Sequence, residues 1–137
     1  NDTRLEVNTD SKEFKTVFKC DRVQLSQVLL NMLGNAYDAV EDLDERWVKI
    51  ELTESDDFFT LAITDSGHGI SEEVRKRIFN PFFTTKITGK GTGLGLSISK
   101  TIIEKHGGSL EIDRGCQNTC FIITLSKKLS KDSLDVD

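Results

Sequence analysis

Two asparagines four residues apart, Asn31 and Asn35, are the first residues whose type and spacing could do chemistry. On a helix this spacing puts two amide oxygens on one face, about 6 Å apart, which suits a magnesium ion and its water ligands. Asn also has a lower helix propensity than Lys or Glu, so it is a poor choice for a merely solvated surface. A solvated face is the alternative, because further polar side chains share this line: Gln24, Gln27 and Asp38.

A second candidate is the short segment of residues 65–70, with the sequence DSGHGI. It follows an apolar run that predicts a strand, so the Asp65 carboxylate should lie at a strand end, where it can accept a hydrogen bond from an exocyclic amine. Gly67 and Gly69 permit positive φ and the close approach of a flat ligand. His68 has no second metal ligand nearby and is interpreted as a loop side chain. An ordinary turn is the alternative interpretation.

A third candidate is the glycine-rich segment of residues 89–96, GKGTGLGL, which leads into a predicted helix. Backbone N–H groups at such a helix start bind anions, so the segment predicts a phosphate site. A Walker A motif would need Gly in place of Thr84 and Ser or Thr in place of Gly91, and a Rossmann motif would need Gly in place of Leu94. Four lysines add positive charge here, the first two within reach of a triphosphate: Lys86, Lys90, Lys100 and Lys105.

Three helices are predicted to position these residues. An apolar stripe with spacings of three and four residues predicts an amphipathic helix of about 20 residues from Asp21. Ser71 caps a short helix that stops before Pro81. Residues 94–106 form another helix, which Gly107 ends. Between the last two helices, low apolar content over residues 80–93 predicts a long mobile loop.

The strands are predicted from alternating apolar residues. Residues 47–53 and 59–63 form one antiparallel hairpin, and residues 110–112 and 121–125 form another. Short runs at residues 5–7 and 17–18 are interpreted as weak edge strands. This order of elements predicts an α+β fold, a two-layer α/β sandwich in which a mixed five-stranded sheet carries about three helices on one face.

Composition bounds the function. With 137 residues, 36% of them hydrophobic, the chain can build one core. A net charge of -5 argues against nucleic acid, and no apolar run is long enough for a membrane span. Three cysteines without a C-x-x-C pattern fit a reduced, intracellular compartment, as core or turn residues. Because the chain does not begin with Met, we expect it to be part of a longer protein.

Four blocks, in order, resemble the N, G1, F and G2 boxes of the catalytic and ATP-binding domain of histidine kinases, which has the GHKL or Bergerat fold. They are residues 31–36, 65–70, 79–86 and 89–96, within a resemblance that runs from about Thr16 to Leu125. The resemblance implies a catalytic domain over residues 1–126 and a polar tail over residues 127–137.

The resemblance also implies a role for each block. Asn35 would coordinate Mg²⁺, Asn31 would lie beside the phosphates, and Asp65 would accept from the adenine amine. The F box would anchor the ATP lid, and the G2 glycines would form the phosphate loop. The implied ATP-binding residues are Asn31, Asn35, Asp38, Asp65, Gly67, Gly69, Ile70, Phe79, Thr85, Lys86, Lys90, Gly91, Thr92, Gly93, Leu94, Gly95 and Leu96.

Two positions depart from the family pattern. Several members have a basic residue where Asp38 stands, which puts that phosphate contact in question. The last hairpin usually carries Gly-Thr, and here Asn118-Thr119 replaces it. Because Asn tolerates the left-handed backbone conformation, the turn is expected to survive.

The resemblance implies transfer of the γ-phosphoryl group of Mg-ATP to a His on a dimeric helical hairpin outside this chain, followed by relay to a response regulator. Neither His68 nor His106 is followed by an acidic residue, as the acceptor His of the family is. We expect a cytoplasmic location, in the cytoplasmic part of a membrane-bound sensor if the whole protein is one, without nucleic-acid binding or direct membrane contact.

Three other functions share this fold. Gyrase-like, chaperone and mismatch-repair ATPases use a Glu base where Asn31 stands, and an amide cannot take a proton from water at neutral pH. Anti-sigma-factor serine kinases are a nearer alternative, although residues 82–86 and 91–96 look more like sensor kinases. A nucleotide-binding module without catalysis is the third.

Overall fold

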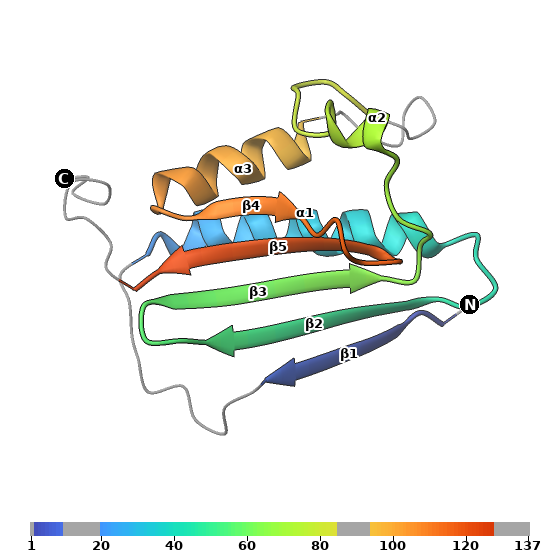
Figure 1. The fold of residues 1–137 in the computed structure, drawn as a ribbon, viewed down its shortest axis with the longest axis horizontal. Helices are drawn as coiled ribbons and strands as arrows, with labels where there is room; N and C mark the ends of the chain where they lie inside the picture. Colours follow the sequence, from blue (N-terminus) through green and yellow to red (C-terminus); the bar gives the residue numbers. More distant parts are fainter. Residues whose placement is uncertain (1, 10–19, 85–93, 128–137) are drawn as a thin grey trace.

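The computed structural model describes residues 2–9, 20–84 and 94–127, which form a two-layer α/β sandwich (Figure 1). One layer is a five-stranded sheet with the strand order β1-β2-β3-β5-β4. The strands are β1 (Arg4–Thr9), β2 (Trp47–Glu54), β3 (Phe58–Asp65), β4 (Ser109–Ile112) and β5 (Thr119–Ser126). β1 pairs with β2 in parallel, and the other neighbours pair antiparallel, so the predicted mixed sheet is confirmed.

The second layer consists of helices. They are α1 (Arg22–Val40), α2 (Glu72–Arg75) and α3 (Gly95–Lys105). α1 and α3 pack side by side against one face of the sheet (Figure 1). β2, β3, β4 and β5 contribute alternate residues to that face, as the two-residue period of a strand requires, whereas β1 is exposed along its length. The core between the layers consists of Val28, Met32, Ala36, Val48, Ile63, Ile102, Ile103, Leu110, Phe121 and Ile123.

The helix ends follow their local sequence signals. The Asp21 carboxylate accepts from the backbone N–H of Gln24 at 3.1 Å and caps α1. The Ser71 hydroxyl accepts from the N–H of Val74 at 3.2 Å and caps α2. Beyond α3, Gly107 has a φ of 74°, a left-handed conformation that glycine adopts without steric cost. These starts and stops agree with the predicted ones.

Some predictions fall outside the described residues. The run at residues 5–7 is confirmed as part of β1, whereas residues 17–18, the loop from 85 to 93 and the tail from 128 onward are outside. All three cysteines are free, and Cys120 is buried in β5. Within the described ranges, no helix combines the length and apolar character needed to cross a bilayer.

A buried histidine joins the end of α3 to the start of α1. His106 is 1% exposed, and its Nε2 lies 3.1 Å from the backbone N of Asp21. Its Nδ1 lies 2.8 Å from the carbonyl oxygen of Ile102. Because the Asp21 N–H can only donate, Nε2 accepts, and Nδ1–H donates to the carbonyl. The hydrogen bonds therefore assign the neutral Nδ1–H tautomer to this ring.

Replacing His106 with Ala is expected to lower the free energy of unfolding by about 1–3 kcal/mol, because the Asp21 N–H and the Ile102 carbonyl both lose their side-chain partner. Urea unfolding at pH 7.5 measures this change. The matched control is the other histidine: His68 is exposed, so His68→Ala should alter stability by less than about 0.5 kcal/mol. Equal stabilities of the two variants would contradict the assigned role of His106.

Candidate functional site

The predicted site residues lie on two neighbouring pairs of elements, β3 with β5 and α1 with α3, toward the end of the sheet where β3 stops and α3 begins (Figure 1). Asp65, the last residue of β3, is the register partner of Thr119 at the start of β5. Asn31 of α1 lies against the first turn of α3. Three further predicted site residues are half-buried and pack against the common core: Ile70, Phe79 and Leu96.

Asp65 is a buried carboxylate, 3% exposed. It lies two residues after the core residue Ile63 on β3, so its side chain is on the helix-covered face. Burial raises the pKa of Asp65 from 3.8 to about 6, and a hydrogen bond from the Gly67 N–H, 2.8 Å from Oδ1, partly offsets this. Within the described residues no other donor reaches the carboxylate, so Oδ2 is left for a ligand donor.

Both glycines of the 65–70 loop are required, for different reasons. A Cβ on Gly67 would lie 2.7 Å from Asp65 Oδ1 and 3.3 Å from Thr119 Oγ1, so a side chain would displace the carboxylate. Gly69 has a φ of 90°, in the left-handed region that favours glycine. His68, between them, is exposed, as predicted for a loop side chain.

Ser66 ties this loop to the start of β2, a role that the sequence did not reveal. Its hydroxyl donates to the carbonyl of Glu45 at 2.9 Å and accepts from the N–H of Trp47 at 3.0 Å. Its own N–H donates to the carbonyl of Trp47 at 3.0 Å. A small hydroxyl residue directly after a strand end is the one signal that could have suggested this contact.

Asn118 supports the same loop from the other side. Its Nδ2 donates to the carbonyl of Gly67 at 3.1 Å. The turn between β4 and β5 is formed, as expected, but Asn118 does not use the left-handed conformation, because Phe82 is the one non-glycine residue with positive φ in the described ranges. The turn is instead compatible with ordinary φ, and the amide is used as a side-chain donor.

The two predicted magnesium-site asparagines, Asn31 and Asn35, are both half-buried on α1, and Asp38 is exposed one turn further on. Asn31 Nδ2 lies 3.4 Å from the hydroxyl of the fully buried Ser99 on α3, a long hydrogen bond. Because the amide nitrogen makes this bond, the amide oxygen of Asn31 is not the atom bound to Ser99. Asn31 Cγ also lies 3.8 Å from the position of a Cβ on Gly95.

The start of α3 differs from the starts of α1 and α2. Leu94 is its N-cap residue, and among the residues that the structure describes no side chain makes a capping hydrogen bond there. The first N–H groups of a helix without a side-chain cap, together with the helix dipole, favour an anion. Gly95 and Leu96 belong to this turn. The other predicted G2 and lid residues lie outside the described residues: Thr85, Lys86, Lys90, Gly91, Thr92 and Gly93.

Phe79 is held firmly at the base of the F box. Its ring packs edge-on against Phe121, with centroids 6.4 Å apart and planes at 83°. The ammonium of Lys100 lies 4.6 Å from the ring centroid and donates to the carbonyl of Leu110 at 3.0 Å. The sequence places Lys100 among the lysines near the predicted phosphate site. In the structure its ammonium instead contacts Phe79 and Leu110.

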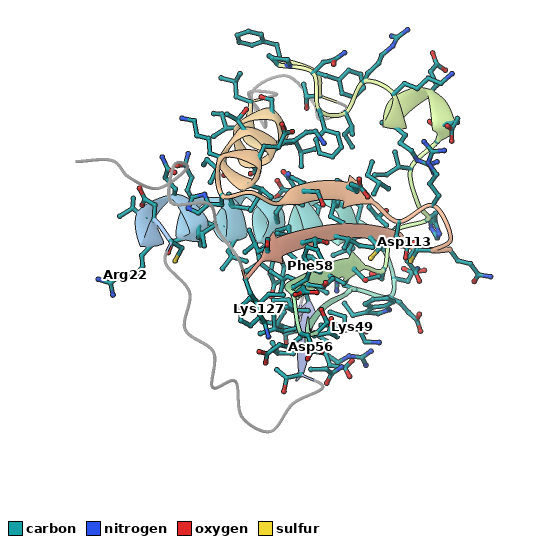
Figure 2. All side chains as sticks on the ribbon, turned by 60° about the vertical axis from the view of Figure 1, so that its left-hand side comes forward. Arg22, Lys49, Asp56, Phe58, Asp113 and Lys127 are labelled. Atoms are coloured by element: carbon teal, nitrogen blue, oxygen red, sulfur yellow. The ribbon has the colours of Figure 1, made fainter. Side chains whose placement is uncertain are left out.

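Two hollows flank these elements. One, of about 440 Å³, lies between the 65–70 loop, α2 and the β4–β5 turn, and Asn118 and Thr119 line it. Asp113, in that turn, is at the same end of the molecule as the chain leading into α2 (Figure 2). The other is a shallow groove along the exposed side of α1, lined by Val23, Leu30 and Asn31 among others. In the described residues, no group of three or more His, Cys, Asp or Glu side chains could hold a metal.

Residues 20–129 match the family model described as histidine kinase-, DNA gyrase B-, and HSP90-like ATPase. The C4-dicarboxylate transport sensor protein DctB of Rhizobium meliloti is 38% identical over 107 residues, which cover 78% of this chain and 17% of DctB. Sensor protein FixL of Bradyrhizobium diazoefficiens is 43% identical over 91 residues, 66% of this chain and 18% of FixL. The chain thus spans less than a fifth of these curated relatives.

Among solved structures, the catalytic domain of histidine kinase ThkA superposes with a TM-score of 0.77 at 33% identity, over 91% of this chain and 80% of that one. Histidine kinase ThkA in complex with the response regulator protein TrrA superposes with a TM-score of 0.71 at 30% identity. That match covers 90% of this chain and 34% of that one.

Proposed function

Because the chain belongs to the histidine kinase-, DNA gyrase B-, and HSP90-like ATPase family, as a histidine kinase catalytic domain, we propose that it transfers the γ-phosphoryl group of Mg-ATP to a histidine. The acceptor lies on a helical hairpin outside this chain. Its imidazole nitrogen attacks the γ-phosphorus, the bond from that phosphorus to the bridging oxygen breaks, and ADP leaves. The phosphoryl group then passes to a response regulator, and both steps occur in the cytoplasm.

The single observation that carries the nucleotide assignment is the buried carboxylate at the end of β3. Asp65 is 3% exposed and receives one backbone hydrogen bond in the described part of the chain. Burying a carboxylate without a cationic partner costs free energy, and Asp65 lies at a loop whose two glycines let a flat base approach. An exocyclic amine such as that of adenine supplies the missing donor.

The donor set on α1 and α3 fits a magnesium-bound triphosphate. Asn31 and Asn35 offer neutral amide oxygens, which suit an ion that keeps several waters and phosphate oxygens as ligands. When bound, Mg²⁺ neutralises charge that develops on the phosphate oxygens during transfer. The first N–H groups of α3 and the lid lysines would hold the remaining phosphate charge. The chain's own contribution is positioning and charge.

Transfer is favoured over hydrolysis because a general base is missing where the ATPases of this fold have one. Asn31 stands there, and its amide nitrogen faces Ser99. An amide cannot accept a proton from water near neutral pH. His106 has both ring nitrogens engaged in a buried site, and His68 is an exposed side chain of the 65–70 loop. We therefore assign the acceptor to another part of the protein.

The test uses labelled ATP with the chain alone and with the acceptor hairpin of the same gene added separately. Alone, the chain should bind Mg-ATP, turn it over very slowly and stay unlabelled. With the hairpin present, an acid-labile, alkali-stable phosphohistidine should form, weakly, because no tether raises the effective concentration. Acid-stable phosphoserine would indicate the serine kinase alternative. Rapid turnover by the chain alone, or label on His68 or His106, would contradict the assignment.

A further inference from the structure

The turn between β4 and β5 touches the 65–70 loop at a side chain that departs from the family pattern. Asn118 is half-buried, and its Nδ2 donates to the carbonyl oxygen of Gly67 at 3.1 Å, across 51 residues of sequence. Glycine, the residue usual at this position in the family that the chain resembles, has no side chain to make this bond. The contact is therefore a property of this chain's own sequence.

The hydrogen bond completes a chain of two that ends at the Asp65 carboxylate. Gly67 donates through its N–H to Asp65 Oδ1 at 2.8 Å and accepts through its carbonyl from Asn118. The peptide groups on both sides of Gly67 are thus held. Thr119 Oγ1 lies 3.3 Å from the position that a Cβ on Gly67 would occupy, so a larger residue at position 67 would crowd the start of β5.

The turn that carries Asn118 is itself well anchored. Asp113 N–H donates to the carbonyl of Cys120 at 2.9 Å, and the Asp113 carboxylate accepts from the N–H of Gly115 at 2.9 Å. The turn and the loop also lie close together at Gly69, because a Cβ added there would lie 3.4 Å from the carbonyl oxygen of Gln117. The turn that carries Asn118 is thus joined to β5 by a backbone hydrogen bond and closed by the Asp113 carboxylate.

We propose that Asn118 is a positioning residue for the base of the nucleotide, acting through Gly67 to hold the Asp65 carboxylate in its binding orientation. The proposal rests on the proposed function, since it concerns the same nucleotide. Without the amide, the Gly67 carbonyl loses its partner and the loop samples further conformations. The apparent dissociation constant then rises in inverse proportion to the fraction of molecules whose loop remains in the binding conformation. The triphosphate end, held by α1 and α3, is unaffected.

The experiment measures dissociation constants by calorimetry for Mg-ATP, adenosine and Mg-tripolyphosphate. Asn118→Ala and Asn118→Gly remove the amide, and Gln117→Ala is the matched control, since Gln117 is an exposed neighbour in the same turn. Both Asn118 variants should bind Mg-ATP and adenosine about 3–10-fold more weakly. Mg-tripolyphosphate should bind within about twofold of wild type, and Gln117→Ala should match wild type with every ligand.

Tripolyphosphate separates positioning of the base from general damage to the fold. If both Asn118 variants bind Mg-ATP as tightly as wild type, or lose tripolyphosphate to the same extent as adenosine, the positioning role is wrong. Asn118→Gly introduces the residue that is usual at this position in the family. It therefore provides a folded variant if Asn118→Ala does not fold. Failure of the wild-type chain to bind Mg-ATP would instead overturn the proposed function.

Discussion

Replacing Asp65 with Asn is expected to stabilise the nucleotide-free domain by about 3 kcal/mol at pH 7.5. The pKa of Asp65 is about 6 in the fold, against 3.8 ordinarily, because the carboxylate is buried. Each unit of such a difference corresponds to about 1.4 kcal/mol. The amide of Asn carries no charge, so the variant avoids the cost of burying one, while its oxygen can still accept from the Gly67 N–H.

The gain should depend on pH in a defined direction. The folded state binds the Asp65 proton more tightly than the unfolded state, so wild-type stability falls as pH rises from about 3.8 through 6. The advantage of Asp65→Asn is therefore greatest above pH 7 and shrinks to about 1 kcal/mol near pH 4.5. Urea unfolding at pH 7.5 and 4.5 measures both values.

The same substitution should reverse the choice of base. With its oxygen on the Gly67 N–H, the Asn amide presents its nitrogen where Oδ2 stands, a donor facing the adenine amine. Wild type should prefer ATP to GTP by about 1–3 kcal/mol, because guanine presents a carbonyl in place of the amine. Asp65→Asn should bind ATP more weakly and GTP more tightly, as measured by calorimetry.

Asp56→Asn is the matched control for both measurements. Asp56 is exposed in the β2–β3 turn, at the opposite end of β3 from Asp65, and is labelled in Figure 2. The control should change stability by less than about 0.5 kcal/mol and leave nucleotide binding unaltered. An Asp65→Asn variant that is less stable than wild type at pH 7.5, or that keeps the preference for ATP, would show that the carboxylate does not have the proposed role.

Replacing Asn35 with Ala is expected to lower phosphoryl transfer to the acceptor hairpin by at least about 100-fold, since a metal ion in such sites supplies several kcal/mol of charge stabilisation. The fold should be retained, because Ala has the highest helix propensity and Asn35 lies within α1. The measurement is the initial rate of phosphohistidine formation at saturating Mg-ATP, with circular dichroism to confirm folding.

Gly34 provides a neighbouring control for Asn35. It is exposed within α1, and a Cβ added there meets no atom within 4 Å. Gly34→Ala should therefore stabilise the domain by about 1 kcal/mol and leave the transfer rate unchanged. If Asn35→Ala transferred phosphate at the rate of Gly34→Ala, Asn35 would not be the magnesium ligand.

Sequence alone determined the elements and the family of this chain. The 3.6-residue period of residues 22–40 and the two-residue period of the strands are local properties, and the structure confirms the helices, hairpins and mixed sheet predicted from them. The order of four short motifs identified the family, which the match over residues 20–129 confirms. Roles assigned to individual residues, such as Asn35 and Lys86, stay predictions, and Lys86 lies outside the described residues.

Tertiary structure alone decided which side chains hold the site in place. Ser66 bonds to Trp47 at the start of β2, Asn118 reaches Gly67, and His106 reaches Asp21, across 19, 51 and 85 residues of sequence. No local period encodes such contacts, because a polar side chain's partner depends on which strands are neighbours and in what register. Asn118 meets the 65–70 loop because β5 pairs directly with β3, with Thr119 opposite Asp65.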